Sequence, residues 1–155
     1  MAAPFSVALH MCQPRPGECF LDLGCGVGKA VLLAALMPPA GKTADGSHEG
    51  WKRVWGIELV AQHVHHGEPF LREYRKLYET KASQRAQRAN ESSCKRPAAL
   101  HMTAPSQVEV IVGDFTQVSW TDEADVVFIA GILVGQTLSY RLHRLLYLYH
   151  SDDVR

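Results

Sequence analysis

The chain has 155 residues, of which 46% are hydrophobic and 21% are charged, so composition and length suit one globular domain over residues 1–155. Its 16 basic and 16 acidic residues give a formal net charge of zero, which favours neither nucleic acid nor an anionic membrane as a partner. No apolar stretch is long enough to span a bilayer, no secretory signal is visible, and the four cysteines lack metal-type spacing. We therefore expect an intracellular protein with free thiols and no bound metal.

Helical and strand-like patterns alternate along the first part of the chain. Residues 4–13 predict a short helix that ends at the prolines and glycine of 14–17. Residues 19–23 are a short apolar run, typical of a buried strand, and 27–37 predict a helix that stops before Pro38. Residues 53–59 predict a second strand.

The next helix is predicted in two pieces, because Gly67 and Pro69 interrupt it. Its second piece carries apolar residues at helical spacing, which predicts one buried face. These residues are Phe70, Tyr74, Leu77 and Tyr78.

Residues 81–107 are polar and rich in Lys and Arg, and we predict a fraying helix followed by an exposed, mobile insertion. The basic side chains of 81–97 are either simply solvated, which we favour, or in contact with nucleic acid or an acidic protein surface. Residues 108–112 and 126–130 predict a third and a fourth strand, and 137–150 a final helix. This alternation predicts an α/β fold with an open, mostly parallel sheet.

A glycine-rich turn, Gly24-Cys25-Gly26-Val27-Gly28, lies between the first strand and the next helix. Glycine permits positive φ and lets a ligand approach the backbone, and the N-terminus of the following helix favours negative charge. A phosphate loop needs four residues between its glycines followed by Lys and Ser or Thr, which this turn lacks. A dinucleotide turn needs GxGxxG, whereas this turn is GxGxG followed by Lys29. A nicotinamide-dependent oxidoreductase is therefore only a weak alternative.

Acidic residues stand near the carboxyl ends of three predicted strands. Asp22 lies two residues before the first glycine, and Glu58 ends the second strand, where a carboxylate can accept both ribose hydroxyls of an adenosyl ligand. Asp114 follows the third strand and can accept from an adenine amino group, while Phe115 packs on the ring. The three strand ends therefore predict an adenosyl-binding rim.

The segments FLDLGCGVGKAVLLAAL, VWGIEL, FLREYRKLY and GDFTQVSWTDEADVVF together resemble the disruptor-of-telomeric-silencing family of core-histone lysine methyltransferases. The resemblance spans roughly residues 5–142, without the 81–107 insertion. It implies a Rossmann-like class I methyltransferase fold, S-adenosyl-L-methionine as the cofactor and a core histone or nucleosome as the protein substrate. If the substrate is a histone, we expect a nuclear location; if it is not, we expect a cytoplasmic one.

The resemblance also implies cofactor-binding roles for residues of the first strand, the glycine turn and the two later strand ends. Lys29 stands where the family often has a polar side chain that reaches the cofactor carboxylate. The residues implied are Asp22, Gly24, Gly26, Gly28, Lys29, Glu58, Asp114 and Phe115.

Two departures from the family pattern keep a second hypothesis open. The family has Asn or another small polar residue after the fourth strand, whereas 130–134 carry no polar side chain. The chain also ends about where a fifth strand would begin, so we expect a sheet truncated after the fourth strand, whose apolar edge could form a homodimer. The catalytic residues stay unidentified, and the alternative function is an inactive cofactor-binding or interaction module.

Overall fold

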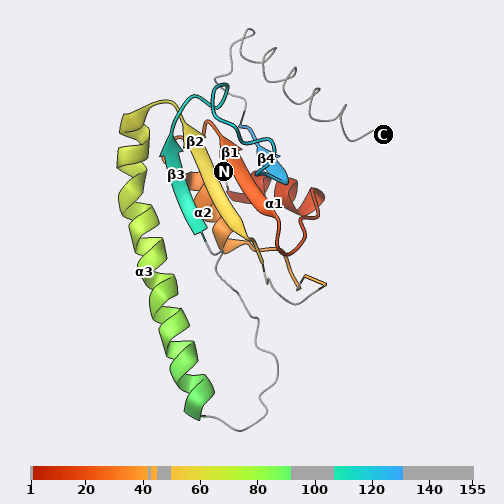
Figure 1. Cartoon of the computed structure of the whole chain (residues 1–155), viewed down its shortest axis with the longest axis vertical. Helices are drawn as coiled ribbons and strands as arrows, with labels where there is room; N and C mark the ends of the chain where they lie inside the picture. The colour runs from red at the N-terminus through yellow and green to blue at the C-terminus, as the bar shows by residue number, and fades with distance from the viewer. Residues whose placement is uncertain (1, 42, 45–49, 92–106, 131–155) are drawn as a thin grey trace.

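Four parallel strands form the sheet of the computed structural model, which describes residues 2–41, 43–44, 50–91 and 107–130. The strands lie in the order β3-β2-β1-β4 (Figure 1), which confirms the predicted α/β fold and is compatible with a Rossmann-like fold. The elements are α1 (Ala2–Met11), β1 (Cys19–Leu23), α2 (Lys29–Leu36), β2 (Arg53–Glu58), α3 (Ala61–Glu91), β3 (Gln107–Val112) and β4 (Val126–Phe128).

The strand order reverses at β1. From β1 the chain passes to β2 and then β3 on one side of the sheet, and it returns to place β4 on the other side of β1. Ligands of open parallel sheets bind beyond the carboxyl ends of the strands at such a switch point, because the adjacent connections leave on opposite sides and open a crevice. The fold therefore directs attention to the ends of β1 and β4.

Helices α1, α2 and α3 pack against one face of the sheet (Figure 1). Phe20 of β1 and Val54 of β2 lie in this core, and the Trp51 indole N–H donates a hydrogen bond of 2.9 Å to the Ala34 carbonyl. The aromatic rings of Phe5 and Phe20 meet edge to face, with centroids 6.0 Å apart. Apolar residues three or four positions apart on α1 and α2 thus cover the side chains of β1 and β2 that point to this face.

The opposite face of the sheet has its own core. Leu21, Trp55 and Ile57 pack there against Trp120 and Ala124, which belong to the segment between β3 and β4. The Trp120 indole N–H donates a 2.7 Å hydrogen bond to the Phe115 carbonyl. The strands are therefore buried on both faces, which explains why β1 and β2 are nearly continuous apolar runs.

The predicted break in α3 is wrong, because the helix runs without interruption from Ala61 to Glu91 although Pro69 lies inside it. A proline removes one backbone hydrogen bond, and the neighbouring turns of this long helix maintain the structure. Residues 81–91, predicted as the fraying helical start of the 81–107 segment, are indeed helical and extend α3 past the sheet (Figure 1). The rest of that insertion, 92–106, lies outside the described residues.

The predicted buried face of α3 is also wrong in part. Tyr74 is buried and Tyr78 half-buried, as expected, but the side chains of Phe70 and Leu77 are 63% and 59% exposed. Leu71 is fully buried instead. The side of α3 that faces the core is instead the one that carries the buried Gly67 and Leu71.

Element ends differ slightly from the predictions elsewhere. The second helix begins at Lys29 rather than at residue 27, because Gly28 still has a left-handed backbone conformation. The fourth strand ends at Phe128 rather than at residue 130. The predicted final helix at 137–150 and the apolar segment beyond residue 130 lie outside the described residues. In the described part of the chain, no helix is long and apolar enough to cross a membrane.

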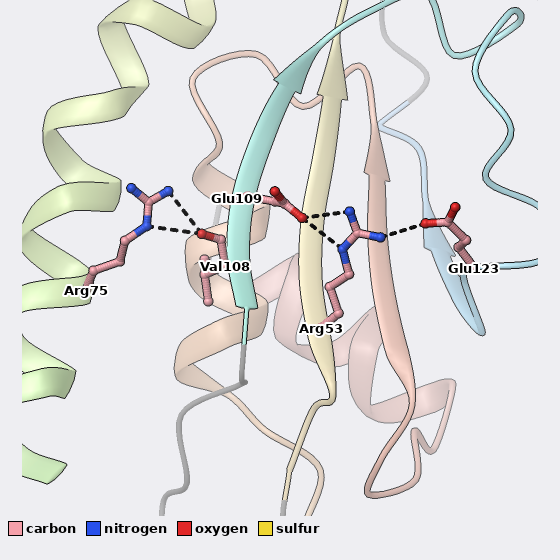
Figure 2. Close-up of polar contacts among 5 residues, drawn as sticks. All are labelled: Arg53, Arg75, Val108, Glu109 and Glu123. Carbon is pink, nitrogen blue, oxygen red and sulfur yellow. Dashed lines mark hydrogen bonds and ion pairs between the residues drawn. The ribbon is translucent and has the colours of Figure 1, made fainter.

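Polar side chains connect elements at the amino-terminal ends of the strands (Figure 2). Arg53 at the start of β2 donates hydrogen bonds of 2.9 and 2.6 Å to Glu109 of β3 and of 2.7 Å to Glu123, just before β4. Its guanidinium also lies 4.0 Å from the centroid of the Trp55 ring. Arg75 of α3 donates hydrogen bonds of 3.3 and 3.1 Å to the Val108 carbonyl of β3. These contacts lie at the opposite end of the sheet from the switch point.

Candidate functional site

The glycine turn adopts a conformation that only glycine accepts readily. Gly24, Gly26 and Gly28 have φ values of 76°, 57° and 79°, all in the left-handed region. The backbone N–H groups of Gly24 and Cys25 donate to the Ile57 carbonyl at 2.9 and 3.2 Å. The end of β2 therefore fixes the beginning of the turn.

The carboxylate of Glu58 also holds the turn. Its Oε2 accepts a 2.8 Å hydrogen bond from the Gly26 N–H, and its Oε1 accepts one of 2.9 Å from the Val60 N–H. The Nδ1 atom of His63, in the first turn of α3, lies 3.4 Å from Oε1. A carboxylate has about four lone-pair positions, so the buried Glu58 retains capacity for a further donor. Sequence reasoning had seen only a ribose acceptor in Glu58 and had not linked it to the turn.

Asp22, near the end of β1, is only 3% exposed, and its Oδ1 atom finds no hydrogen-bond partner among the described residues. Burial, and after it the nearby charge of Glu58, raises the pKa of Asp22 to about 7. A buried carboxyl with an unsatisfied oxygen is costly to the free protein and well suited to a donor or cation supplied by a ligand.

A cavity of about 430 Å³ opens at the switch point between β1 and β4. One part of its wall is the glycine turn with Asp22 and Lys29, and the other part is apolar. Ligand pockets of proteins have volumes of about 300–1,000 Å³ and combine an apolar lining with a few polar groups. The lining residues are Phe5, Asp22, Gly24, Cys25, Gly26, Val27, Lys29, Ala30, Leu33, Phe128 and Ala130.

The missing side chains of two glycines leave space in this cavity. A Cβ atom added to Gly24 or to Gly26 would meet no other described atom within 4 Å, so both positions face open space. Gly28 differs, because an added Cβ would lie 3.2 Å from Cγ2 of Val110, and Gly28 does not line the cavity. Gly24 and Gly26 thus offer backbone to a ligand, whereas Gly28 lets α2 begin close to the sheet.

Asp114 and Phe115 do not line the cavity, but they follow the strand end next to Glu58. The Gly113 N–H donates a 2.9 Å hydrogen bond to the Glu58 carbonyl. The Oδ1 atom of Asp114 accepts hydrogen bonds of 2.9 and 2.7 Å from the N–H and hydroxyl of Thr116. Phe115 is half-buried against the second core. The predicted acidic residues therefore share the carboxyl edge of the sheet, with Asp22 in the cavity and Asp114 beyond Glu58.

Sequence reasoning missed the apolar wall, which comes from Phe5 of α1, Leu33 of α2 and Phe128 of β4. The rings of Phe5 and Phe128 meet edge to face with centroids 5.1 Å apart. Cys25 also lines the cavity, and burial raises the pKa of its thiol above the usual range. Within the ranges that the structure describes, His, Cys, Asp and Glu side chains form no group of three that could hold a metal ion.

Comparison with known proteins adds no family assignment, since no protein-family model and no curated protein matches the chain.

Proposed function

We propose that the chain is the cofactor-binding domain of a class I methyltransferase that uses S-adenosyl-L-methionine. The observation that supports this most strongly is the cavity at the β1–β4 switch point. It is bounded by a turn with left-handed glycines and by the buried carboxyl of Asp22, whose Oδ1 atom has no hydrogen-bond partner among the described residues. A phosphate-binding loop would present backbone N–H groups to an anion, and an unpaired carboxyl in the same cavity would repel that anion.

The charges of the cavity fit the amino-acid group of this cofactor. The unpaired carboxyl of Asp22 suits an ammonium group, and Lys29 at the first turn of α2 suits a carboxylate. Gly24 and Gly26 would lie against the methionine part of the cofactor. Both positions face open space, which a Cβ atom would partly fill. A zwitterion thus finds two complementary groups within one cavity.

Glu58, Asp114 and Phe115 would hold the adenosine part at the neighbouring strand ends. Glu58 keeps lone-pair capacity for a ribose hydroxyl beside its bonds to Gly26 and Val60. When bound, the cofactor supplies an electrophilic methyl group on a sulfonium. The part of this chain is to bind and orient the cofactor and, through Phe5, Leu33 and Phe128, to exclude water from the reacting centre.

For the methyl acceptor we propose a lysine of a core histone, on the sequence resemblance alone. A nuclear location is part of the same proposal. An unprotonated amine acceptor would need no strong general base from this chain, so positioning by the chain would supply most of the acceleration.

A second candidate function is a binding module without methyl transfer. The described cavity wall next to β4 consists of Phe128 and Ala130, which offer no polar side chain to an acceptor. A methyl-transfer assay on core histones, run on protein already shown to bind the cofactor, separates the two candidates. Turnover supports the enzyme, and binding without turnover supports the module.

The proposal is tested by titration calorimetry with S-adenosylmethionine, S-adenosylhomocysteine and NAD in parallel. We expect binding of the first two, and Glu58→Ala should weaken it at least roughly tenfold, because charge-assisted hydrogen bonds contribute about 1.5–3 kcal/mol each. Glu73→Ala is the matched control, since the exposed Glu73 lies on the surface of α3, where it pairs with Lys76. Folded wild-type protein that binds neither adenosyl compound would refute the proposal.

A further inference from the structure

Helix α3 contacts the glycine turn at a position where the helix has no side chain. Gly67 is buried, and a Cβ atom added to it would lie 2.9 Å from the carbonyl carbon of Val27, 3.2 Å from its Cα, and closer still to its oxygen. These are backbone atoms of the turn, which cannot rotate away as the end of a flexible side chain can. An alanine at this position would therefore have to displace either the helix or the turn.

Val27 follows the three residues of the turn whose N–H groups bind the end of β2. The Ile57 carbonyl accepts from Gly24 and Cys25, and Glu58 accepts from Gly26. The next residue, Val27, meets α3 at Gly67. Consecutive residues of the turn are thus fixed first by the end of β2 and then by the helix that follows it.

Glycine in the middle of a helix is unfavourable, because it loses much backbone entropy and adds no packing of its own. Gly67 lies in the second turn of α3, one turn before the buried Leu71, on the side that faces the core. The close approach to Val27 accounts for both its presence and the rotation of α3 that leaves Phe70 exposed.

We propose that Gly67 is a positioning residue for the cofactor turn, through which α3 sets the place of Val27 and hence the shape of the cavity wall formed by residues 24–27. The identity of the ligand rests on the proposed function, whereas the contact between Gly67 and Val27 does not. A turn that is already fixed in the free protein binds its ligand more tightly, because the turn loses less conformational freedom on binding.

The test is Gly67→Ala, with His66→Ala as the matched control on the exposed side of the same helical turn. In an unobstructed helix, Gly→Ala raises the melting temperature by roughly 2–4 °C for a domain of this size. We expect the opposite sign, a fall of roughly 2–10 °C, as for other overpacked sites. A higher melting temperature for Gly67→Ala than for the wild-type protein would overturn the proposal.

Two further readouts separate positioning from a simple loss of stability. The amide resonances of Gly24, Gly26 and Gly28 in nitrogen–proton correlation spectra should move in Gly67→Ala and stay in place in His66→Ala. Affinity for S-adenosylhomocysteine should fall at least roughly tenfold, since the N–H and carbonyl groups of the turn would no longer be in place. If Gly67→Ala is poorly folded in buffer, the spectra are recorded in sucrose, which favours the compact state.

Unmoved glycine amides would overturn the proposal even if stability fell. If the wild-type protein does not bind S-adenosylhomocysteine, the proposed function fails, while the melting temperature and the amide shifts still decide the role of Gly67.

Discussion

Glu58 lies close enough to Asp22 for its charge to contribute to the raised pKa of Asp22, yet the surroundings of the two carboxyl groups differ. Glu58 accepts hydrogen bonds from two backbone N–H groups, whereas Oδ1 of Asp22 accepts none from the residues that the structure describes. The free protein thus tolerates an unfavourable carboxyl in its cavity. Such a residue is typical of binding sites, where a ligand group completes what the protein leaves unsatisfied.

Replacing Asp22 should therefore stabilise the free protein at neutral and alkaline pH. The pKa of Asp22 is about 7 in the folded protein and near 3.9 in the unfolded chain, so folding favours the protonated form. Below pH 4 both states are protonated and no cost arises, and as the pH rises to 7 and above, folding must bury a charge. We expect Asp22→Asn to be more stable than wild type at pH 8, by on the order of 2–4 kcal/mol, and equally stable near pH 4.

Urea unfolding across this pH range measures the difference, with the exposed Asp122→Asn as a control that should show no such dependence. The same Asp22→Asn variant should bind S-adenosylhomocysteine more weakly, because a neutral amide attracts an ammonium group less than a carboxylate does. An Asp22→Asn protein less stable than wild type at pH 8 would mean that the carboxylate has a partner in the folded state.

The polar residues that line the cavity could be predicted from the sequence because they are local, whereas the contact of Glu58 with Gly26 joins residues far apart in the chain. The glycine spacing, Asp22 two residues earlier and Lys29 directly after the turn all lie within one short segment. Phe5 and Phe128 could not be predicted as cavity residues, because an apolar side chain looks the same in a sequence whether it fills a core or lines a cavity. Only the meeting of α1 with the end of β4 makes that distinction.

At the level of elements, α3 shows where periodicity alone is insufficient. Phe70, Tyr74, Leu77 and Tyr78 fit one helical face in the sequence, but Gly67 decides which side of the helix approaches the sheet. A backbone contact needs a residue without a side chain, and hydrophobic spacing gives no weight to such a residue. The strands were easier to predict, because β1 and β2 are buried on both faces and bounded by turn residues.

The observed rotation of α3 predicts contrasting effects of the same substitution at two positions. Leu71→Ala removes a fully buried side chain and should reduce the free energy of unfolding by about 2–5 kcal/mol. Leu77→Ala changes a side chain that is 59% exposed and should alter it by less than about 0.5 kcal/mol. Urea unfolding of both variants checks the assignment, and similar losses would show that Leu77 is buried in solution.

At the scale of the whole molecule, the polar contacts that join the strands and the site proposed for ligand binding lie at opposite ends of one sheet. At the amino-terminal ends of the strands, Arg53 joins β2 to Glu109 of β3 and to Glu123 before β4 (Figure 2). The backbone of Cys19 also exchanges hydrogen bonds with Asp125, at 2.8 and 3.0 Å. At the carboxyl ends, Glu58 and the glycine turn form the site. Contacts that hold the strands together are thus separate from contacts proposed to hold the ligand.

This separation predicts that Arg53→Met weakens the fold without weakening the site. Methionine keeps much of the apolar packing on Trp55 but loses the hydrogen bonds to Glu109 and Glu123, so we expect a loss of about 1–3 kcal/mol in urea unfolding. Arg53→Lys should lie between, because lysine keeps the charge but not the planar fork. Calorimetry on the folded fraction should give an affinity for S-adenosylhomocysteine within a few-fold of wild type, since distant sites act additively. A tenfold loss of affinity in folded Arg53→Met would mean that the two ends of the sheet are coupled, with strand spacing at Arg53 transmitted along β2 to Glu58.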